Sequence, residues 1–183
     1  MSCKHRDFAI WLTGLPGSGK STLAQQLHRQ LLERGVDAAV LTSDDLRQVL
    51  TPHPTYSPDE RDRFYHALIH IGSLLLDHHV PVIFDATANR RQYRDAARQR
   101  FACFLEVYVD TPLAVCRQRD PKGLYARADQ GTRPTLPGVG APYEPPERPD
   151  LVVHGDRETP EAGAARIITM LEDRKILRPV TEH

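Results

Sequence analysis

A glycine-rich run near the start of the chain has the residues of a phosphate-binding loop. Residues 14–21 read Gly-Leu-Pro-Gly-Ser-Gly-Lys-Ser and satisfy the pattern G-x-x-x-x-G-K-[ST]. Its glycines allow backbone conformations that are closed to other residues, so several N–H groups can converge on phosphate oxygens. We therefore expect a nucleoside triphosphate to be bound by Gly14, Leu15, Pro16, Gly17, Ser18, Gly19, Lys20, Ser21 and Thr22.

The run ends in a lysine and a serine, the residue types that phosphate-binding loops of this pattern use in phosphoryl transfer. Lys20 can bridge the β- and γ-phosphates of ATP as a catalytic residue, and the Ser21 hydroxyl can bind Mg²⁺. The chain contains 20 Arg and only 4 Lys, so a lysine at this place indicates a specific requirement. The alternative interpretation is a glycine-rich turn that merely begins a helix. The guanine-reading run Asn-Lys-x-Asp does not occur, which disfavours a switch GTPase.

A second polar cluster, at residues 42–47, follows a short apolar run and reads Thr-Ser-Asp-Asp-Leu-Arg. A carboxylate at Asp44 can accept the proton of an attacking hydroxyl or hold Mg²⁺ through water, which makes it the candidate base and a candidate metal ligand. Arg47, one helical turn later, can bind an acidic group of the acceptor. The competing interpretation is that Asp44 or Asp45 only caps the next helix.

The elements that must position these residues follow from the apolar pattern. Strands are predicted at 8–13, 38–42, 80–84, 104–110 and 151–153. Helices are predicted to begin near Lys20, Ser57, Tyr93 and Thr159. Strands that alternate with helices predict an α/β fold of the P-loop NTPase type, with a doubly wound, parallel, five-strand sheet. Such sheets bind ligands at the carboxyl ends of their strands, where both polar clusters lie.

A segment from about residue 119 to 149 is rich in Pro, Gly and charge, and we expect it to lie outside the core. It is too long for an ordinary connection inside a compact domain, and loops of this length are usually functional lids or disordered. We interpret residues 1–183 as a single P-loop kinase domain that carries this segment as its lid.

The chain also resembles the adenylylsulfate kinases, which transfer the γ-phosphate of ATP to the 3′-hydroxyl of adenylyl sulfate (APS). The resemblance covers most of the chain and includes the glycine-rich run, Asp44 with Arg47, and Tyr56-Ser57 followed by Arg61. Its most specific part is Val109-Asp110-Thr111-Pro112-Leu113 with Arg119-Asp120-Pro121-Lys122-Gly123-Leu124-Tyr125. It implies ATP and Mg²⁺ as cofactors and a homodimer as the assembly. It also implies an ATP-base contact at Arg119 and acceptor contacts at Asp44, Arg47, Arg61, Lys122 and Leu136.

Several positions near the acceptor depart from the family's pattern. Thr42 replaces an aspartate, Phe64 an asparagine and Ala88 a serine. Leu136 stands where the family has an aromatic residue that stacks on the acceptor adenine, and Gly140 replaces a nearby aspartate. Leucine can press an apolar face on a base but lacks the stacking geometry of a ring. These changes predict weaker use of APS, or preference for a related nucleotide.

The charge of the acceptor pocket narrows the substrate class. Arg47, Arg61 and Lys122 are expected to face one pocket, where they would repel one another around a neutral ligand. They predict a small, anionic, nucleotide-like acceptor, with APS as the first choice.

Two other readings remain open. The chain is also similar to the polynucleotide 5′-hydroxyl kinases at residues 43–47 and 85–89, where Asp85 is either a Mg²⁺ partner or a helix cap. A nucleotide-binding module without transferase activity is the rival class. Retained Asp44 and Arg47 argue against it, because simple binding of ATP needs neither.

The bulk composition restricts partners and location. Positive and negative side chains balance at 24 each, which disfavours a nucleic-acid partner. No apolar stretch is long enough to span a bilayer, so we expect no membrane partner. The three cysteines show no close pair, which predicts neither a disulfide framework nor a zinc site and favours a reducing cytoplasm.

Overall fold

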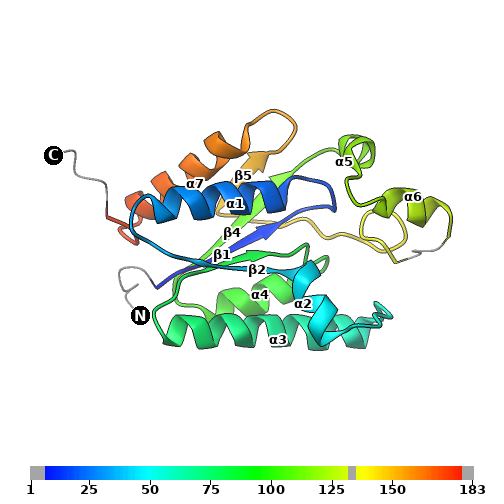
Figure 1. The fold of residues 1–183 in the computed structure, drawn as a ribbon, viewed down its shortest axis with the longest axis horizontal. Helices are drawn as coiled ribbons and strands as arrows, with labels where there is room; N and C mark the ends of the chain where they lie inside the picture. The colour runs from blue at the N-terminus through cyan, green and yellow to red at the C-terminus, as the bar shows by residue number, and fades with distance from the viewer. Residues whose placement is uncertain (1–6, 132–134, 179–183) are drawn as a thin grey trace.

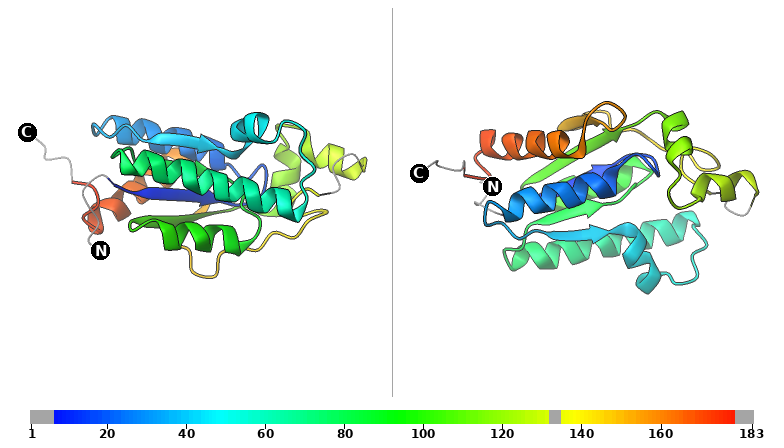
Figure 2. Two further views of the ribbon diagram at one scale, coloured as in Figure 1. Left: turned by 90° about the horizontal axis from the view of Figure 1, so that it is seen from below. Right: turned by 45° about the horizontal axis from the view of Figure 1, so that its top comes forward.

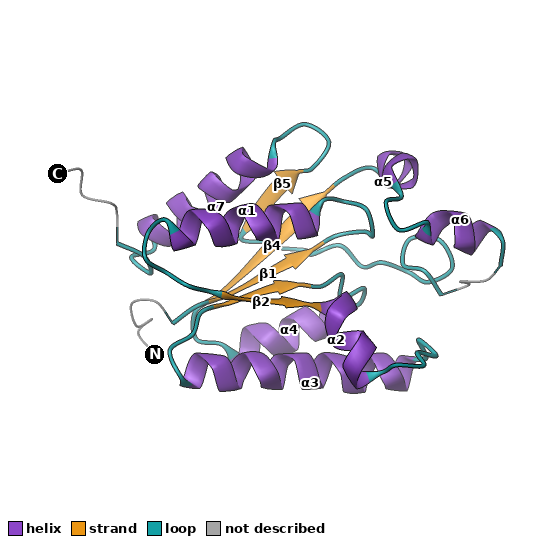
Figure 3. Cartoon of the chain, in the orientation of Figure 1, coloured by secondary structure: helices purple, strands orange, loops and turns teal. Residues whose placement is uncertain are grey.

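A parallel five-stranded sheet forms the centre of the computed structural model, which describes residues 7–131 and 135–178. The strands are β1 (Ala9–Thr13), β2 (Ala39–Thr42), β3 (Val82–Asp85), β4 (Phe104–Asp110) and β5 (Leu151–His154). Their spatial order is β2-β3-β1-β4-β5, and every neighbouring pair is parallel. Figure 3 shows this sheet between layers of helices. The predicted α/β fold is confirmed.

Helices cover both faces of the sheet (Figures 1 and 2). On one face lie α1 (Lys20–Leu32) and α7 (Pro160–Asp173), and on the other lie α3 (Pro58–Asp77) and α4 (Arg91–Arg100). Alternate residues of a strand point to opposite faces. Ile10 and Leu12 therefore pack in the core of α1 and α7, whereas Ala9 and Trp11 pack in the core of α3 and α4. The continuous apolar run of β1 supplies both cores.

The helix starts follow from their caps. At the start of α3, Ser57 Oγ accepts the backbone N–H of Glu60 at 3.3 Å, and Thr159 caps α7 in the same way. The N-cap of α1 is Gly19, with φ 103° and no side-chain cap. The N–H groups of its first turn are therefore left for another acceptor. The predicted starts of these three helices are confirmed.

The residues after β3 are held against β1. Trp11 Nε1 donates to the carbonyl of Ala86 at 2.9 Å, and Thr13 Oγ1 donates to the carbonyl of Thr87 at 2.7 Å. The two strands are also register partners, with Leu12 opposite Asp85. The end of β3 is thereby fixed relative to the glycine-rich loop that leaves β1.

The short helix α5 (Leu113–Arg119) leads into the lid, and a second short helix, α6 (Leu124–Asp129), lies within it. The Tyr125 hydroxyl donates to the Pro16 carbonyl at 2.8 Å, which joins the lid to the glycine-rich loop. Tyr125, Leu136 and Cys116 form a small buried cluster. The expectation that nothing from 119 to 149 is core is therefore wrong for Tyr125 and Leu136. Part of the lid, at 132–134, lies outside the described residues.

Other sequence predictions need correction. α2 (Ser43–Leu50) follows β2 directly, and α5 and α6 have only 7 and 6 residues, too short for a periodic signal. Asp120 supports α6, because its carboxylate accepts hydrogen bonds from the first three N–H groups of that helix.

Cys103 is disulfide-bonded and Cys116 is a free thiol, so the expectation of no disulfide is wrong at Cys103. Among the described residues no helix is long and apolar enough to cross a membrane.

A buried arginine joins three parts of the chain behind the site. Arg94 of α4 is 0% exposed, and its Nε donates to Glu106 of β4 at 2.7 Å. Its other nitrogens donate to the carbonyls of Ala88, in the loop after β3, and of Glu144, at the end of the lid. This one side chain thus fixes the loop and the returning lid to the sheet.

We predict that Arg94→Met lowers the free energy of unfolding by about 3–5 kcal/mol, because Glu106 then loses a buried partner. Urea denaturation measures the change. The double variant Arg94→Met with Glu106→Gln should lose less than the single variant, because it leaves no buried carboxylate unpaired. A single variant as stable as wild type would contradict this role of the pair.

Candidate active site

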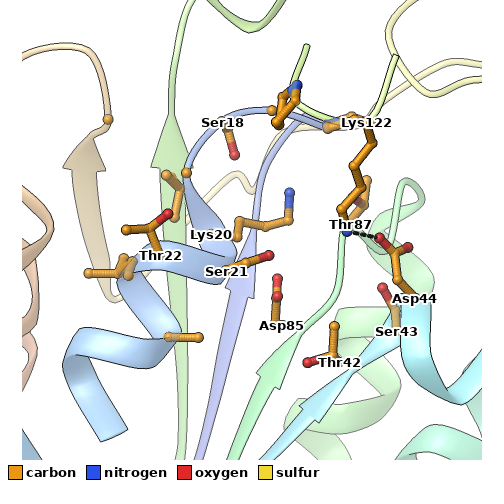
Figure 4. Close-up of a pocket in the computed structure, with 18 of the residues that line it drawn as sticks. Ser18, Lys20, Ser21, Thr22, Thr42, Ser43, Asp44, Asp85, Thr87 and Lys122 are labelled. Carbon is orange, nitrogen blue, oxygen red and sulfur yellow. Dashed lines mark hydrogen bonds and ion pairs between the residues drawn. The ribbon is translucent and has the colours of Figure 1, made fainter. Parts of the chain in front are cut away.

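The carboxyl ends of the strands open into a cleft of about 1080 Å³. Its walls come from the glycine-rich loop, the first turns of α1 and α2, the ends of β2 and β3, and the lid. Figure 4 shows that side chains from these elements point into one space. The cleft is lined by almost every residue singled out in the sequence, namely Pro16, Gly17, Ser18, Gly19, Lys20, Ser21, Thr22, Asp44, Arg47, Arg61, Arg119, Lys122 and Leu136.

The glycine-rich loop has the shape of an anion cradle. A Cβ on Gly14 would lie 2.5 Å from the Val109 carbonyl oxygen and 2.8 Å from Ser18 Oγ, so only glycine fits. Gly17, at φ 76°, has the left-handed conformation that favours glycine. Ser18 Oγ is buried and has no hydrogen-bond partner among the described residues. The uncapped start of α1 adds free N–H groups and the positive end of a helix dipole. These features fit a bound phosphate chain.

Lys20 is held by the loop itself. Its Nζ donates to the carbonyls of Leu15, at 2.8 Å, and Gly14, at 3.1 Å, and the residue is only 7% exposed. Burial lowers the pKa of this amine below its ordinary value, and the carboxylate of Asp85 is the strongest opposing influence. Lys20 therefore lies at the cradle, and Asp85 is the carboxylate that influences its charge most.

The candidate base makes an ion pair with the lid. Lys122 Nζ lies 2.6 Å from Asp44 Oδ2, and both side chains are about half exposed. This hydrogen bond is the main cause that raises the pKa of Lys122. An exposed pair of this kind contributes about 0–1 kcal/mol. A ligand that binds either partner can therefore replace it at little cost.

Neither Asp44 nor Asp45 is the N-cap of α2, so the helix-cap interpretation of these carboxylates is wrong. The N-cap of α2 is Thr42, and it makes no side-chain cap hydrogen bond. Asp44 and Asp45 lie in the first turn, where acidic residues are favoured by the helix dipole. Asp44 is paired with Lys122 of the lid, and within the described residues Asp45 has no such pair.

Arg47 is held by an aromatic ring and a carboxylate. Its Cζ lies 3.8 Å from the centroid of the Phe64 ring, and its Nη1 donates to Glu60 Oε1 at 3.3 Å. Burial would raise the pKa of Glu60, but hydrogen bonds from Thr55 and Tyr56 and the charge of Arg47 lower it. Glu60 lies in the first turn of α3, where the local sequence indicates only a helix start. Its long-range partner Arg47 gave no local signal.

Arg61 is a buried connector between α3 and the lid. Its nitrogens donate to the Tyr56 carbonyl at 3.0 Å, to Asn89 Oδ1 at 3.1 Å and to the Thr135 carbonyl at 2.8 Å. Burial lowers the pKa of this guanidinium below its ordinary value. Arg61 lines the cleft, as the sequence suggested, but all three of its nitrogens already bind protein oxygens. Its predicted contact with the acceptor stays a prediction.

Arg119 and Leu136 lie at different walls of the cleft. Arg119 Nη2 donates to the Gly155 carbonyl at 2.8 Å, and its Nη1 is 4.0 Å from where a Cβ on Gly19 would lie. This places Arg119 beside the cradle, and its contact with the ATP base stays a prediction. Leu136 is 4% exposed and packs with Tyr125 in the lid.

The cations of the acceptor side are partly compensated. Arg47 is paired with Glu60 and Lys122 with Asp44. Repulsion among unpaired positive charges therefore does not describe this pocket, because two of its cations already have carboxylate partners. An anionic acceptor would instead have to compete with resident carboxylates, most easily at the exposed Lys122.

Comparison with known proteins decides which family this arrangement represents. Residues 6–154 match the family model described as adenylylsulphate kinase. The chain belongs to the adenylylsulfate kinase family. The adenylyl-sulfate kinase of Halothermothrix orenii is 38% identical over 170 residues, which cover 93% of this chain and 92% of that protein.

Further relatives of the adenylylsulfate kinase family agree. The bifunctional enzyme CysN/CysC of Mycobacterium tuberculosis is 40% identical over 171 residues, which cover 91% of this chain and 28% of that longer protein. The solved structure of the Mycobacterium tuberculosis APS kinase CysC in complex with AMPPNP and APS has a TM-score of 0.87 and 38% identity. That comparison covers 92% of this chain and 99% of the solved one. The resemblance noted in the sequence is confirmed.

We predict that Lys20→Ala lowers kcat by about 10²–10³-fold, because the charge serves the transferring phosphoryl group rather than the core. Initial rates of ADP release measure the loss, and thermal unfolding should show a folded variant. Lys175→Gln is the matched control, since Lys175 is exposed and outside the cleft. Near wild-type turnover by folded Lys20→Ala would refute the assignment of the loop.

Proposed function

We propose that this protein transfers the γ-phosphate of ATP to the 3′-hydroxyl of adenylyl sulfate. The observation that carries the proposal is the cleft, where the phosphate cradle, Asp44 and the lid residue Lys122 meet in a member of this family. In the reaction the acceptor oxygen forms a bond to the γ-phosphorus, the bond to the β-phosphate oxygen breaks, and the hydroxyl proton leaves. The products are ADP and the 3′-phosphorylated acceptor.

The residues act mainly by positioning and by charge neutralisation. The cradle binds the phosphate chain, and Lys20 leaves the carbonyls of Gly14 and Leu15 to meet the β- and γ-phosphates. Asp44 orients the acceptor hydroxyl and accepts its proton. When the acceptor binds, Lys122 releases Asp44 and pairs with the anionic part of the acceptor. This change of partner couples substrate binding to the position of the lid.

The site also suits a magnesium ion. The Ser21 hydroxyl is exposed at the start of α1 and lines the cleft. Hydroxyl and carboxylate oxygens are the hard ligands that Mg²⁺ prefers, together with substrate phosphates and water. When bound, the ion neutralises charge on the β- and γ-phosphates. Ser21 is therefore proposed as a metal ligand, with Asp44 as the sequence-derived second candidate.

The remaining parts of the proposal concern organisation. Residues 1–183 act as one kinase domain, with a lid at about 119–149 that excludes water during transfer. A cytoplasmic location, a homodimer and the absence of a nucleic-acid partner are expectations from the family resemblance and the composition. The departures at Thr42, Phe64, Ala88, Leu136 and Gly140 predict weaker use of APS, or preference for a related nucleotide, than in other members of the family.

We predict that Asp44→Asn lowers kcat by about 10²–10⁴-fold with little change in the KM for ATP, because only Asp44 is assigned to the reacting hydroxyl. Asp45→Asn is the matched control, since it lies in the same helical turn and has the same charge. It should change either constant only mildly. A larger loss at Asp45 would mean that the other carboxylate is the base.

An acceptor panel tests the substrate class. Purified protein and Mg-ATP are offered APS, other nucleotides with a substituted phosphate, nucleosides, simple sugars and a 5′-hydroxyl oligonucleotide, and ADP release is compared. We expect the highest kcat/KM with APS or a related anionic nucleotide. Preference for a neutral sugar would refute the anionic acceptor. Preference for the oligonucleotide would favour the polynucleotide kinase alternative, and no acceptor-dependent release would favour a binding module.

A further inference from the structure

Asp85 is a buried carboxylate that faces the cleft. It ends β3, is 4% exposed, and lines the cleft with Lys20 and Ser21. Within residues 7–131 and 135–178 its carboxylate makes no hydrogen bond or ion pair. Burying a charge is costly unless it is paired. Lys20 is an electrostatic counterpart of Asp85 but forms no ion pair with it in the described residues, so this deep carboxylate suits a cation that binds together with the phosphates.

The ordinary structural role of a strand-ending aspartate does not apply to Asp85. Such a residue often caps the next helix. The next helix, α4, has Arg90 as its N-cap and no side-chain cap hydrogen bond. The helix-cap reading of Asp85, which the sequence left open, is thus wrong.

The backbone around Asp85 is held in place by pairing with strands on both sides. Asp85 lies in register with Leu12 of β1 on one side and with Thr42 of β2 on the other. The two residues that follow it are hydrogen-bonded by Trp11 and Thr13 of β1. The carboxylate of Asp85 is therefore fixed relative to the phosphate cradle, which directly follows β1. Figure 4 shows it directed toward the side chains of Lys20 and Ser21.

We infer that Asp85 is the carboxylate that holds Mg²⁺ beside Ser21, directly or through a bound water, which leaves Asp44 to the acceptor. This assignment rests on the proposed use of ATP. Mg²⁺ is usually bound by one or two carboxylates together with substrate phosphates, so a single carboxylate here is sufficient. Asp44 is less suited, because it is half exposed and paired with Lys122 at 2.6 Å. The single positive charge of Lys20 does not balance the negative charges of Asp85 and of the β- and γ-phosphates of a bound nucleotide.

Nucleotide binding tests the assignment without catalysis. Isothermal titration measures the affinity for AMPPNP with Mg²⁺ and with EDTA in wild type, Asp85→Asn and Asp44→Asn. In Asp85→Asn the gain in affinity that Mg²⁺ gives should fall by about 10–100-fold. The affinity in EDTA should be unchanged or higher, because a negative charge near the phosphates is gone. Asp44→Asn should keep the wild-type gain.

Two further readouts separate a metal role from a structural one. The affinity of the enzyme–AMPPNP complex for Mn²⁺, measured by electron paramagnetic resonance, should fall in Asp85→Asn and not in Asp44→Asn. Without metal and nucleotide, Asp85→Asn should unfold at or above the wild-type temperature, because an unpaired buried charge is removed. A lower temperature, or a Mg²⁺ effect lost in Asp44→Asn and kept in Asp85→Asn, would overturn the assignment. Failure of wild type to bind AMPPNP would instead refute the proposed function.

Discussion

The hydrogen-bonded register of β2, β3 and β1 is the constraint on which the site depends. Thr42, Asp85 and Leu12 are register partners across three adjacent strands, so the chain leaves the sheet at the same level each time. From that level β1 enters the cradle, β2 enters the helix that carries Asp44, and β3 ends in Asp85 itself. A slip of one residue would turn each side chain to the opposite face. The side-chain hydrogen bonds from Trp11 to the Ala86 carbonyl and from Thr13 to the Thr87 carbonyl oppose such a slip between β1 and β3.

The charges of the cleft divide into a deep set and a shallow set. Lys20 and Asp85 are both less than 10% exposed. Lys20 donates to loop carbonyls, and Asp85 ends a strand that is paired in register with β1. Lys122 and Asp44 are about half exposed and reach each other across the cleft from the lid and α2. Deep charges suit the constant part of the reaction, which is the nucleotide and its ion. Shallow charges can exchange partners, which suits an acceptor that enters and a product that leaves.

Much of this arrangement was predictable because its signals are local. The pattern at 14–21, the apolar runs of the strands and the cap at Ser57 each lie within a few residues. The pairs Arg47 with Glu60, Arg61 with Thr135 and Arg94 with Glu106 join residues from different elements, so no spacing rule reveals them. The role of Asp85 could not be decided from sequence for the same reason. A cap and a ligand have the same residue type at a strand end, and only the absence of a cap contact separates them.

The most direct test of the central claim is to follow the γ-phosphate itself. Wild-type protein is incubated with APS and ATP labelled in the γ-phosphoryl group, and the products are examined by phosphorus NMR. A chain that positions the acceptor hydroxyl in line with the cradle should yield ADP and one new phosphomonoester, coupled to the 3′ proton of the ribose, in equal amounts. ADP accompanied only by inorganic phosphate, or a label at any other position of the acceptor, would contradict the account.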